Sequence, residues 1–348
     1  MKETSDELKN RITIRDVAEL AGVSISTVSN FLNENFRNMS AETRERVERA
    51  IDTLDYFPSL GAQSLPRKRA TQTICIVIPH DVDYTFHHPY FAEVMRGIAS
   101  SIDAEGYRAL ILTTKGKDHS EAAYIRGLSR ALVDGAIFFD VEPQDPYVHE
   151  FAGSRLPFMI VGRSEETNHF VDADIERGVA DAADHLLNLG HRAIALISGP
   201  TNLVFSEQLV RGYRFALERR GVAVQEELVT FGPFSEENGH STIESLLASH
   251  PEPTAAIAGS GKQAIGVIEY LRKNEMRVPD DLSIVSFGHH PIATLHGLSL
   301  TYLDQPEVEI GRTVAESLLT LIRNPAEQFT PKILPLQLII GESTTGIR

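Results

Sequence analysis

The stretch that decides the fold of the N-terminal part reads IRDVAELAGVSISTVSNFLN, from Ile14 to Asn33. Its apolar residues recur at helical spacing up to Gly22, and glycine commonly ends a helix. Thr13 can cap this first helix, and Ser24 can cap a second helix over Ile25–Leu32. Two helices joined by a glycine-containing turn form the helix-turn-helix pattern, whose second helix enters the major groove of DNA.

A third helix is predicted after Ser40, its expected N-cap, and completes a headpiece over residues 11–57. A small helical hairpin with no role in DNA binding would show the same spacing, so the spacing alone leaves the function open. The side chains expected to form the core of the headpiece are Ile14, Val17, Ala18, Ala21, Val28, Leu32, Val47, Ala50, Ile51 and Leu54.

The amino-acid identities in this segment are more specific than the spacing of its apolar residues. Ile14–Asn33, Ser40-Ala-Glu-Thr-Arg-Glu-Arg-Val47 and Leu54-Asp-Tyr-Phe-Pro58 together resemble the headpiece of the lactose-repressor (LacI/GalR) family of bacterial transcription regulators. The resemblance implies a sequence-specific DNA-binding regulator, expected to be a repressor. It also implies that a homodimer binds a pseudo-palindromic operator in double-stranded DNA, with half-sites related by the two-fold axis of the protein.

The resemblance places Ile25, Ser26 and Asn30 at the positions that read bases. Many family members carry arginine where this chain has Asn30; because asparagine prefers adenine and arginine prefers guanine, we expect an operator that departs from the common one. Ser24 and Thr27 are better suited to holding phosphates, which positions the protein without reading sequence. The DNA-contacting residues predicted in the headpiece are Thr13, Ser24, Ile25, Ser26, Thr27, Ser29 and Asn30.

Residues 58–70 are predicted to be a hinge and linker. In the family this stretch becomes a helix on DNA, and the residue that matches Leu65 wedges into a minor-groove step. Ala62 is the second contact that we expect here. Gly61 lowers helix propensity by roughly 1 kcal/mol relative to alanine, so we expect this helix to fold only on DNA. An ordinary linker would account for the composition equally well.

From Thr73 onward, short β-branched runs alternate with amphipathic helices, which predicts an α/β body with doubly wound parallel sheets in two lobes. The strands are expected at Ile74–Ile78, Ala109–Thr113, Ala136–Phe139, Phe158–Val161, Ala193–Ile197, Ala255–Ala258 and Leu282–Phe287. The helices are expected at Tyr90–Glu105, Glu121–Leu132, Ile175–Leu189, Leu209–Arg220, Asn238–Ser249, Gln263–Asn274 and Val308–Ile322.

The resemblance extends to the periplasmic-binding-protein-like core of the family. It implies an N-terminal lobe of residues 71–170 and 300–326 and a C-terminal lobe of residues 171–299 and 327–348. A small-molecule effector would lie between the lobes, facing the carboxyl ends of the strands. The motifs that carry this resemblance are His88–Gly97, Val171–Asp174, Leu189–Arg192, Arg211–Arg214 and Val278–Val285.

The expected effector site departs from the family pattern. Leu209 replaces a common arginine, Ser260-Gly261 replaces an Asn-Asp pair, and Gly288-His289 replaces a pair of aspartates. Because the replaced groups hydrogen-bond sugar hydroxyls in sugar-responsive members, a simple neutral sugar is in doubt, and the effector is expected to be carbohydrate-related or anionic. The predicted effector-binding residues are His88, Tyr90, Arg163, Leu209, Phe234, Ser260, Gly261, Lys262 and His289.

The segment Gly259–Ala264 has the form G-x-G-x-x-A, the fingerprint of a dinucleotide site. It could hold an anion on helix amides together with Lys262 and Arg163, or its glycines could simply form a tight turn. No acidic residue follows the next strand to bind a ribose, which argues against a nicotinamide enzyme, and no nucleophile elbow is present. We therefore expect no catalysis and no cofactor.

Two histidine pairs, His87-His88 and His289-His290, are expected on loops beside the same cleft. They could bind a metal or respond to pH, but no carboxylate or thiol ligand is convincingly placed beside them. We therefore predict no metal site. A regulator that has lost its response to small molecules remains the main alternative to an effector-responsive one.

Composition agrees with a cytoplasmic protein that does not enter the membrane. The 348 residues include one cysteine, Cys75, and the net charge is −15. Residues 1–70 hold 11 basic and 11 acidic residues, so the body, with 22 basic and 37 acidic residues, carries the whole negative charge. A neutral head on an acidic body fits a protein whose head alone meets a polyanion. A polar N-terminus argues against a secretory signal, and hence against a transporter's solute-binding protein.

Overall fold

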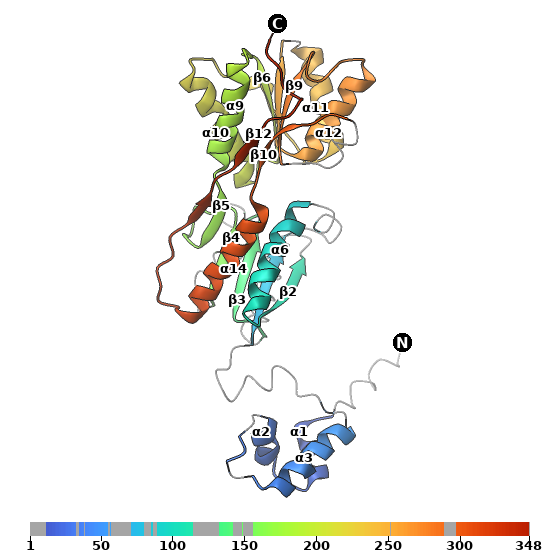
Figure 1. Ribbon diagram of the computed structural model, residues 1–348, viewed down its shortest axis with the longest axis vertical. Helices are drawn as coiled ribbons and strands as arrows, with labels where there is room; N and C mark the ends of the chain where they lie inside the picture. Colours follow the sequence, from blue (N-terminus) through green and yellow to red (C-terminus); the bar gives the residue numbers. More distant parts are fainter. Residues whose placement is uncertain are drawn as a thin grey trace. The chain divides into compact units, whose positions relative to one another are not determined.

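The computed structural model describes residues 12–32, 35–37, 39–54, 56, 71–79, 85, 89–113, 132–141, 148, 156–250, 252–288 and 297–347. The chain divides into two compact units, Met1–Thr71 and Gln72–Arg348 (Figure 1). We call the first the headpiece and the second the body, and each is described by itself.

The headpiece consists of α1 (Ile14–Ala21), α2 (Ile25–Leu32) and α3 (Ala41–Leu54). Thr13 is the N-cap of α1, and both its backbone N–H and its hydroxyl donate to the Asp16 carboxylate, at 2.6 and 2.7 Å. Gly22 ends α1 with φ of 63°, a left-handed conformation that glycine adopts at little cost. Ser24 and Ser40 accept hydrogen bonds from the backbone N–H groups three residues on, as N-caps of α2 and α3.

One apolar cluster holds the three helices together. Its buried members are Val17, Ala18, Ala21, Val28, Val47, Ala50 and Tyr56, and Ile14, Leu32, Ile51 and Leu54 pack against it partly buried. The predicted helix-turn-helix and its inward-facing residues are therefore confirmed, because short helices with strong caps carry their pattern locally.

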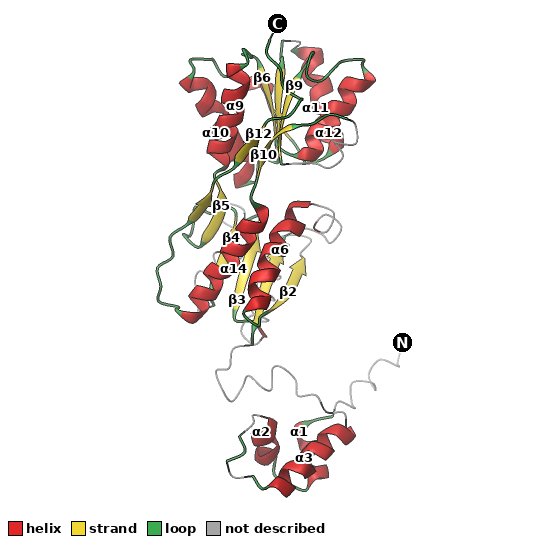
Figure 2. Ribbon diagram, viewed as in Figure 1, coloured by secondary structure: helices red, strands yellow, loops and turns green. Residues whose placement is uncertain are grey.

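The body contains two six-stranded sheets with helices packed against them (Figure 2). The first sheet has the order β11-β5-β4-β3-β1-β2 and is parallel throughout. The second has the order β12-β10-β9-β8-β6-β7 and is parallel except for β12. In the first sheet the strands are β1 (Thr73–Ile78), β2 (Arg108–Thr113), β3 (Gly135–Phe139), β4 (Phe158–Val161), β5 (Phe170–Ala173) and β11 (Lys332–Leu334). In the second they are β6 (Ile194–Ser198), β7 (Val229–Phe231), β8 (Ala255–Ala258), β9 (Ser283–Phe287), β10 (Thr301–Asp304) and β12 (Gln337–Ile339).

The helices pack in pairs. They are α6 (Pro89–Ala104) with α14 (Glu307–Arg323), α9 (Ile175–Asn188) with α10 (Val204–Arg219), and α11 (Glu236–Ser249) with α12 (Gly261–Lys273); a short 3₁₀ helix spans Glu226–Leu228. Glycines let the backbones of α6 and α14 approach closely. A Cβ on Gly97 would lie 2.1 Å from the Val308 carbonyl oxygen, and one on Gly311 would lie 2.0 Å from that of Val94.

The chain crosses between the two sheets three times: between β5 and α9, between β10 and α14, and between β11 and β12. We call the part built on the first sheet the N-lobe and the part built on the second sheet the C-lobe. The boundaries expected from sequence fall a few residues too early. Residues 171–173 belong to β5 of the first sheet, residues 301–304 to the second and residues 332–334 to the first.

Seven of the observed strands match the predicted ones to within a residue, and β5, β7, β10, β11 and β12 were not predicted. The missed strands have only three or four residues, too few to show a period of two. Helix α10 begins at Val204, five residues before its predicted start, because the buried polar residues Ser206 and Gln208 interrupt its apolar stripe. The predicted helix at Glu121–Leu132 lies almost wholly outside the described residues.

Within the described part of the chain, no helix combines the length and the apolar character needed to cross a membrane.

Candidate DNA-binding and effector-binding sites

The face of α2 predicted to read bases is open to solvent. Ile25, Ser26 and Asn30 are exposed, whereas Val28 on the opposite face is fully buried. Ile25 stands out, because it is an apolar side chain that remains 44% exposed. Thr27 and Ser29 are half-buried at the edges of this face.

Hydroxyl groups gather at the start of α2. The Ser24 hydroxyl lies 2.7 Å from that of Ser26 and 2.8 Å from that of Thr27, and it accepts the Thr27 backbone N–H at 3.1 Å. The cap therefore orients the polar residues that were predicted to meet DNA. Thr13 is exposed, but its hydroxyl is engaged with Asp16 and lowers the pKa of that carboxyl. Ala62 and Leu65, the two predicted hinge contacts, lie outside the described residues.

A cavity of about 180 Å³ lies in the body at the carboxyl ends of strands from both sheets. Doubly wound sheets bind ligands at this end of their strands. From the N-lobe and the segment that returns to it, the cavity is lined by Pro89, Tyr90, Phe91, Asp140, Val141, Val161, Gly162, Arg163, Asp172, Gln305 and Glu307. From the C-lobe it is lined by Leu203, Val204, Phe205, Gln208, Phe234, Gly259, Ser260, Gly261, Lys262, Phe287 and Gly288.

The structure brings together six of the predicted effector-binding residues: Tyr90, Arg163, Phe234, Ser260, Gly261 and Lys262 all line the cavity. Leu209 does not. It is fully buried in the apolar core, and the residue before it, Gln208, faces the cavity instead. Successive helical residues point about 100° apart, so an error of one position moves a side chain from the wall into the core. His88 and His289 lie outside the described residues.

Aromatic rings form much of the C-lobe wall. Phe205 lies between Phe234 and Phe287 and meets both edge to face, with ring centroids 5.7 and 4.9 Å away. Phe234 was expected here and the other two were not. Phe287 ends a buried strand, a position that could have signalled its role. Phe205 lies in the part of α10 that the prediction missed.

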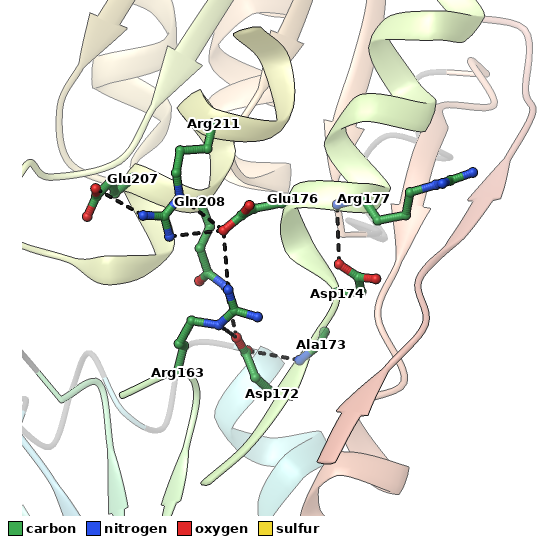
Figure 3. Close-up of polar contacts among 9 residues, drawn as sticks. All are labelled: Arg163, Asp172, Ala173, Asp174, Glu176, Arg177, Glu207, Gln208 and Arg211. Atoms are coloured by element: carbon green, nitrogen blue, oxygen red, sulfur yellow. Dashed lines mark hydrogen bonds and ion pairs between the residues drawn. The ribbon is translucent and has the colours of Figure 1, made fainter. Parts of the chain in front are cut away.

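A polar network runs beside the cavity and connects the two lobes (Figure 3). Asp172 on β5 accepts the Gln208 side-chain amide at 2.9 Å and the Ala173 backbone N–H at 2.9 Å, and the Arg163 Nε lies 3.8 Å away. The Asp172 side chain is buried, and loss of hydration raises the pKa of its carboxyl to about 6 against these hydrogen bonds and the nearby cation.

Arg163 also reaches the start of α9. Its Nη1 lies 3.3 Å from the Glu176 Oε1, which also accepts from Arg211 on α10, at 3.0 Å from Nε and 2.9 Å from Nη2. Arg211 pairs in turn with Glu207 at 3.1 Å. Arg163 is therefore held between Asp172 and Glu176 and is not a cation reserved for a bound anion.

Two more carboxylates line the cavity, Asp140 and Glu307. Burial, with Asp304 and Glu93 nearby, raises the pKa of Glu307 to about 7 against a backbone hydrogen bond. Burial also raises the pKa of Tyr90 well above its ordinary value, and Asp140, Asp172 and Glu307 all act in the same direction. Tyr90 thus lies in the electrostatic field of three carboxylates that line the same cavity.

The glycine loop adopts the geometry of a tight turn into a capped helix. Ser260 caps α12 by accepting the Gln263 backbone N–H at 3.2 Å. Gln263 is fully buried, and its side-chain amide donates to the Ser198 and Pro233 carbonyls and to the Asn238 side chain. A Cβ on Gly259 would lie 2.9 Å from the Ile197 carbonyl oxygen. Packing thus accounts for Gly259 and capping for Ser260.

Among the described residues, no group of three or more histidine, cysteine, aspartate or glutamate side chains is arranged to hold a metal ion. The histidine pairs at 87–88 and 289–290, which raised that question, lie outside those residues.

A helix-turn-helix headpiece followed by a two-lobed body with a cleft defines the class of DNA-binding regulators built on a periplasmic-binding-protein-like core. The chain matches the family model for bacterial regulatory proteins of the lacI family over residues 13–59, and that for the periplasmic binding protein-like domain over residues 183–344. It is 30% identical to the HTH-type transcriptional regulator CelR of Thermobifida fusca, over 97% of this chain and 99% of the relative. It is 32% identical to catabolite control protein A of Priestia megaterium, over 90% of this chain and 93% of the relative. The chain belongs to the LacI family of bacterial transcriptional regulators.

Solved structures agree. A complex of the transcriptional regulator CelR with cellobiose superposes with a TM-score of 0.73 at 29% identity, covering 96% of this chain and 100% of the other. A lac repressor dimer bound to operator and the anti-inducer ONPF superposes with a TM-score of 0.77 at 26% identity, covering 96% and 99%. The expected family, the α/β fold and the function as a DNA-binding regulator are thereby confirmed.

Proposed function

We propose that this protein is a transcriptional repressor that binds a pseudo-palindromic operator as a homodimer and releases or tightens its hold when a small molecule enters the cleft of the body. The observation that carries the proposal is that one chain joins an exposed, capped reading helix to a two-lobed body whose cavity both lobes line. Several relatives are named as transcriptional regulators or repressors, which also argues for regulation and against catalysis.

The residues that line the cavity favour a neutral, polyhydroxylated effector of the carbohydrate class. Asp140, Asp172 and Glu307 offer acceptors for hydroxyl groups, and Gln208 and Gln305 offer amides. Phe205, Phe234 and Phe287 offer an apolar surface on which the C–H face of a sugar ring can pack. A carbohydrate is also the ligand named for one of the similar structures, a complex with cellobiose.

An anionic effector has less support. Three carboxylates line the cavity, and Arg163 is engaged with two acidic side chains. Lys262 is the other lysine or arginine among the lining residues, and the Ser260 hydroxyl already caps α12. An added negative charge would be placed near like charges in a poorly hydrated site, which costs free energy.

In the operator complex, Asn30 would read adenine through a bidentate contact, and Ile25 would meet a thymine methyl group. Ser24, Ser26, Thr27 and Ser29 would hold phosphates or bases through their hydroxyls. Leu65 would wedge into the minor groove, with Ala62 beside it. We expect Asn30→Ala to relax sequence preference at one base pair of each half-site, at a cost of about 1–3 kcal/mol.

Selection of genomic fragments with the purified protein at fixed salt tests the DNA-binding part. We expect one palindrome to be enriched and its enrichment to weaken with Leu65→Ala. Enrichment of no sequence, with and without cell extract, would contradict the proposal. If a palindrome is enriched, the genes next to it in the genome would suggest effectors.

A thermal-shift series with neutral mono- and disaccharides and with their phosphorylated forms tests the effector part. A ligand that binds the native body raises its melting temperature. We expect a neutral sugar to raise it and Phe205→Ala to remove the response. A shift with phosphorylated sugars alone would overturn the effector class, and no shift with any ligand would favour a regulator without a small-molecule response.

A further inference from the structure

The two lobes of the body are joined by three short crossing segments, at Asp174, at Gln305–Pro306 and at Pro335–Leu336. Lobes joined by a few element-terminal residues can rotate about them, because those residues absorb the change in backbone angles. What holds the lobes in one arrangement must then include side-chain contacts that cross from one lobe to the other.

Two such contacts lie side by side beside the cavity (Figure 3). Gln208, on α10 of the C-lobe, donates to Asp172, on β5 of the N-lobe, at 2.9 Å. Arg163, which follows β4 of the N-lobe, pairs with Glu176 at the start of α9, a C-lobe helix, at 3.3 Å. We propose that Gln208–Asp172 and Arg163–Glu176 form an inter-lobe latch that fixes the arrangement of the lobes and that the effector must engage to change it.

The Gln208–Asp172 contact is the buried half of the latch. Gln208 is 2% exposed and Asp172 is 5% exposed, and a hydrogen bond to a buried carboxylate is strong because water does not compete for it. If the lobes parted, the Asp172 carboxylate would lose a donor that offsets its burial. The contact therefore favours one relative position of β5 and α10.

The Arg163–Glu176 contact is the half-buried part of the latch and is reinforced from the C-lobe. The Glu176 carboxylate contacts two nitrogens of the Arg211 guanidinium, and Arg211 also forms an ion pair with Glu207. The acceptor that meets Arg163 is therefore fixed to α10 as well as to α9. A single exposed ion pair contributes little, but a network of fixed charges holds one geometry better than an isolated pair.

Three of the four latch residues, Arg163, Asp172 and Gln208, also line the cavity. A hydroxyl group that donates to Asp172 or accepts from Arg163 would compete with a contact between the lobes. Glu176 does not line the cavity, so it acts on the lobes without touching the ligand. The latch is thus a positioning device, and its effect on DNA affinity rests on the function proposed above.

Distance measurements between spin labels on the two lobes test the latch without an effector or DNA. Asp103→Cys on α6 and Lys273→Cys on α12 are exposed label sites, and doubly labelled protein is diluted into an excess of unlabelled protein so that distances within one chain dominate. Cys75 does not compete for the label, because burial raises the pKa of its thiol to about 12 and lowers its reactivity.

Four proteins are compared: the wild type, Gln208→Leu, Glu176→Gln and the double variant. The matched control is Asp181→Asn, which removes an ion pair with Arg177 inside α9 and crosses no boundary. We expect each latch variant to broaden the inter-lobe distance distribution or add a second population, the double variant to do so most, and the control to match the wild type. Circular dichroism checks that all variants are folded.

An unchanged distribution in the folded double variant would overturn the latch, and so would an equal change in the control. The operator found by selection gives a second readout: we expect Glu176→Gln to change operator affinity at least fivefold. If the distances respond and no operator is bound by any protein, the latch stands and the proposed function fails. If an operator is bound and the distances do not respond, the proposed function stands and the latch fails.

Discussion

The headpiece and the effector cleft are built in different ways. In the headpiece, the predicted reading residues lie on one helix of eight residues, and Ser24, Ile25, Ser26 and Asn30 are exposed together. In the cleft, the lining residues come from segments that span more than two hundred positions, from Pro89 to Glu307. A site formed by one helix can be found from its spacing, whereas a site formed by two lobes depends on how the sheets are arranged.

The largest expected effect concerns the core of the headpiece, which is a compact unit separate from that of the body. Val28 is fully buried at the centre of the headpiece core, and Val28→Asp places an unpaired charge there, which costs several kcal/mol, on the order of the stability of so small a domain. We expect loss of operator binding and of the headpiece thermal transition, with the transition of the body unchanged. Leu20→Asp, on an exposed position of α1, is the control and should keep the fold. A body that melts earlier in the Val28 variant would show that the units are coupled.

The next effect concerns the cleft and its buried carboxylates. Folding raises the pKa of Asp172 from 3.8 to about 6, so between these values the folded state holds more protons than the unfolded state. The stability of the body should therefore fall as pH rises from about 4 to 6, by up to roughly 3 kcal/mol from this group. Glu307, whose pKa is raised to about 7, extends the fall toward neutral pH.

Asp172→Asn removes this contribution. We expect the variant to gain stability relative to the wild type as pH rises through that range, as measured by urea unfolding at a series of pH values. Asp181→Asn, on α9 and not among the residues that line the cavity, is the matched carboxylate-to-amide control. A difference between Asp172→Asn and the wild type that is constant with pH would contradict the raised pKa.

A smaller effect is expected from the close packing of helices in the body. Gly311→Ala would place a Cβ 2.0 Å from the Val94 carbonyl oxygen, and backbone cannot move aside cheaply. We expect a loss of about 1–3 kcal/mol from the body, seen as a lower midpoint of urea unfolding. Gly346→Ala, where the Cβ would lie at an ordinary 3.5 Å from its neighbour, is the matched control. A stable Gly311 variant would mean that α6 and α14 can separate.

The smallest expected effects concern helix capping by a serine, which occurs in both the headpiece and the body. Ser24 caps α2 and Ser260 caps α12, each by accepting the N–H three residues on, at 3.1 and 3.2 Å. Replacing either serine with alanine should cost about 1 kcal/mol. In calorimetry, Ser24→Ala should lower the headpiece transition and Ser260→Ala that of the body. An effect of Ser24→Ala on operator binding that exceeds its effect on stability would indicate that its hydroxyl also contacts DNA.

The sequence by itself determined the helix-turn-helix, its caps and its core, and seven of the observed strands. Each of these is a local pattern: Gly22 and Ser24 end and begin helices through bonds to residues three or four positions away. The resemblance to the family also rested on the amino-acid identities of short segments. Four of the body's missed strands, β5, β10, β11 and β12, lie where the chain crosses between sheets, and their three or four residues pair only because a neighbouring strand is present.

Only the tertiary structure decided which side chains meet in the cleft. The turn of α10 brings Gln208 to the wall and buries Leu209. Asp172, Gln208 and Glu176 come from three different elements and Arg163 from the loop after β4, and nothing in their spacing along the chain relates them. A hydrogen bond between two lobes depends on the orientation of both, and the orientation is set by the packing of whole sheets and helices rather than by any one segment.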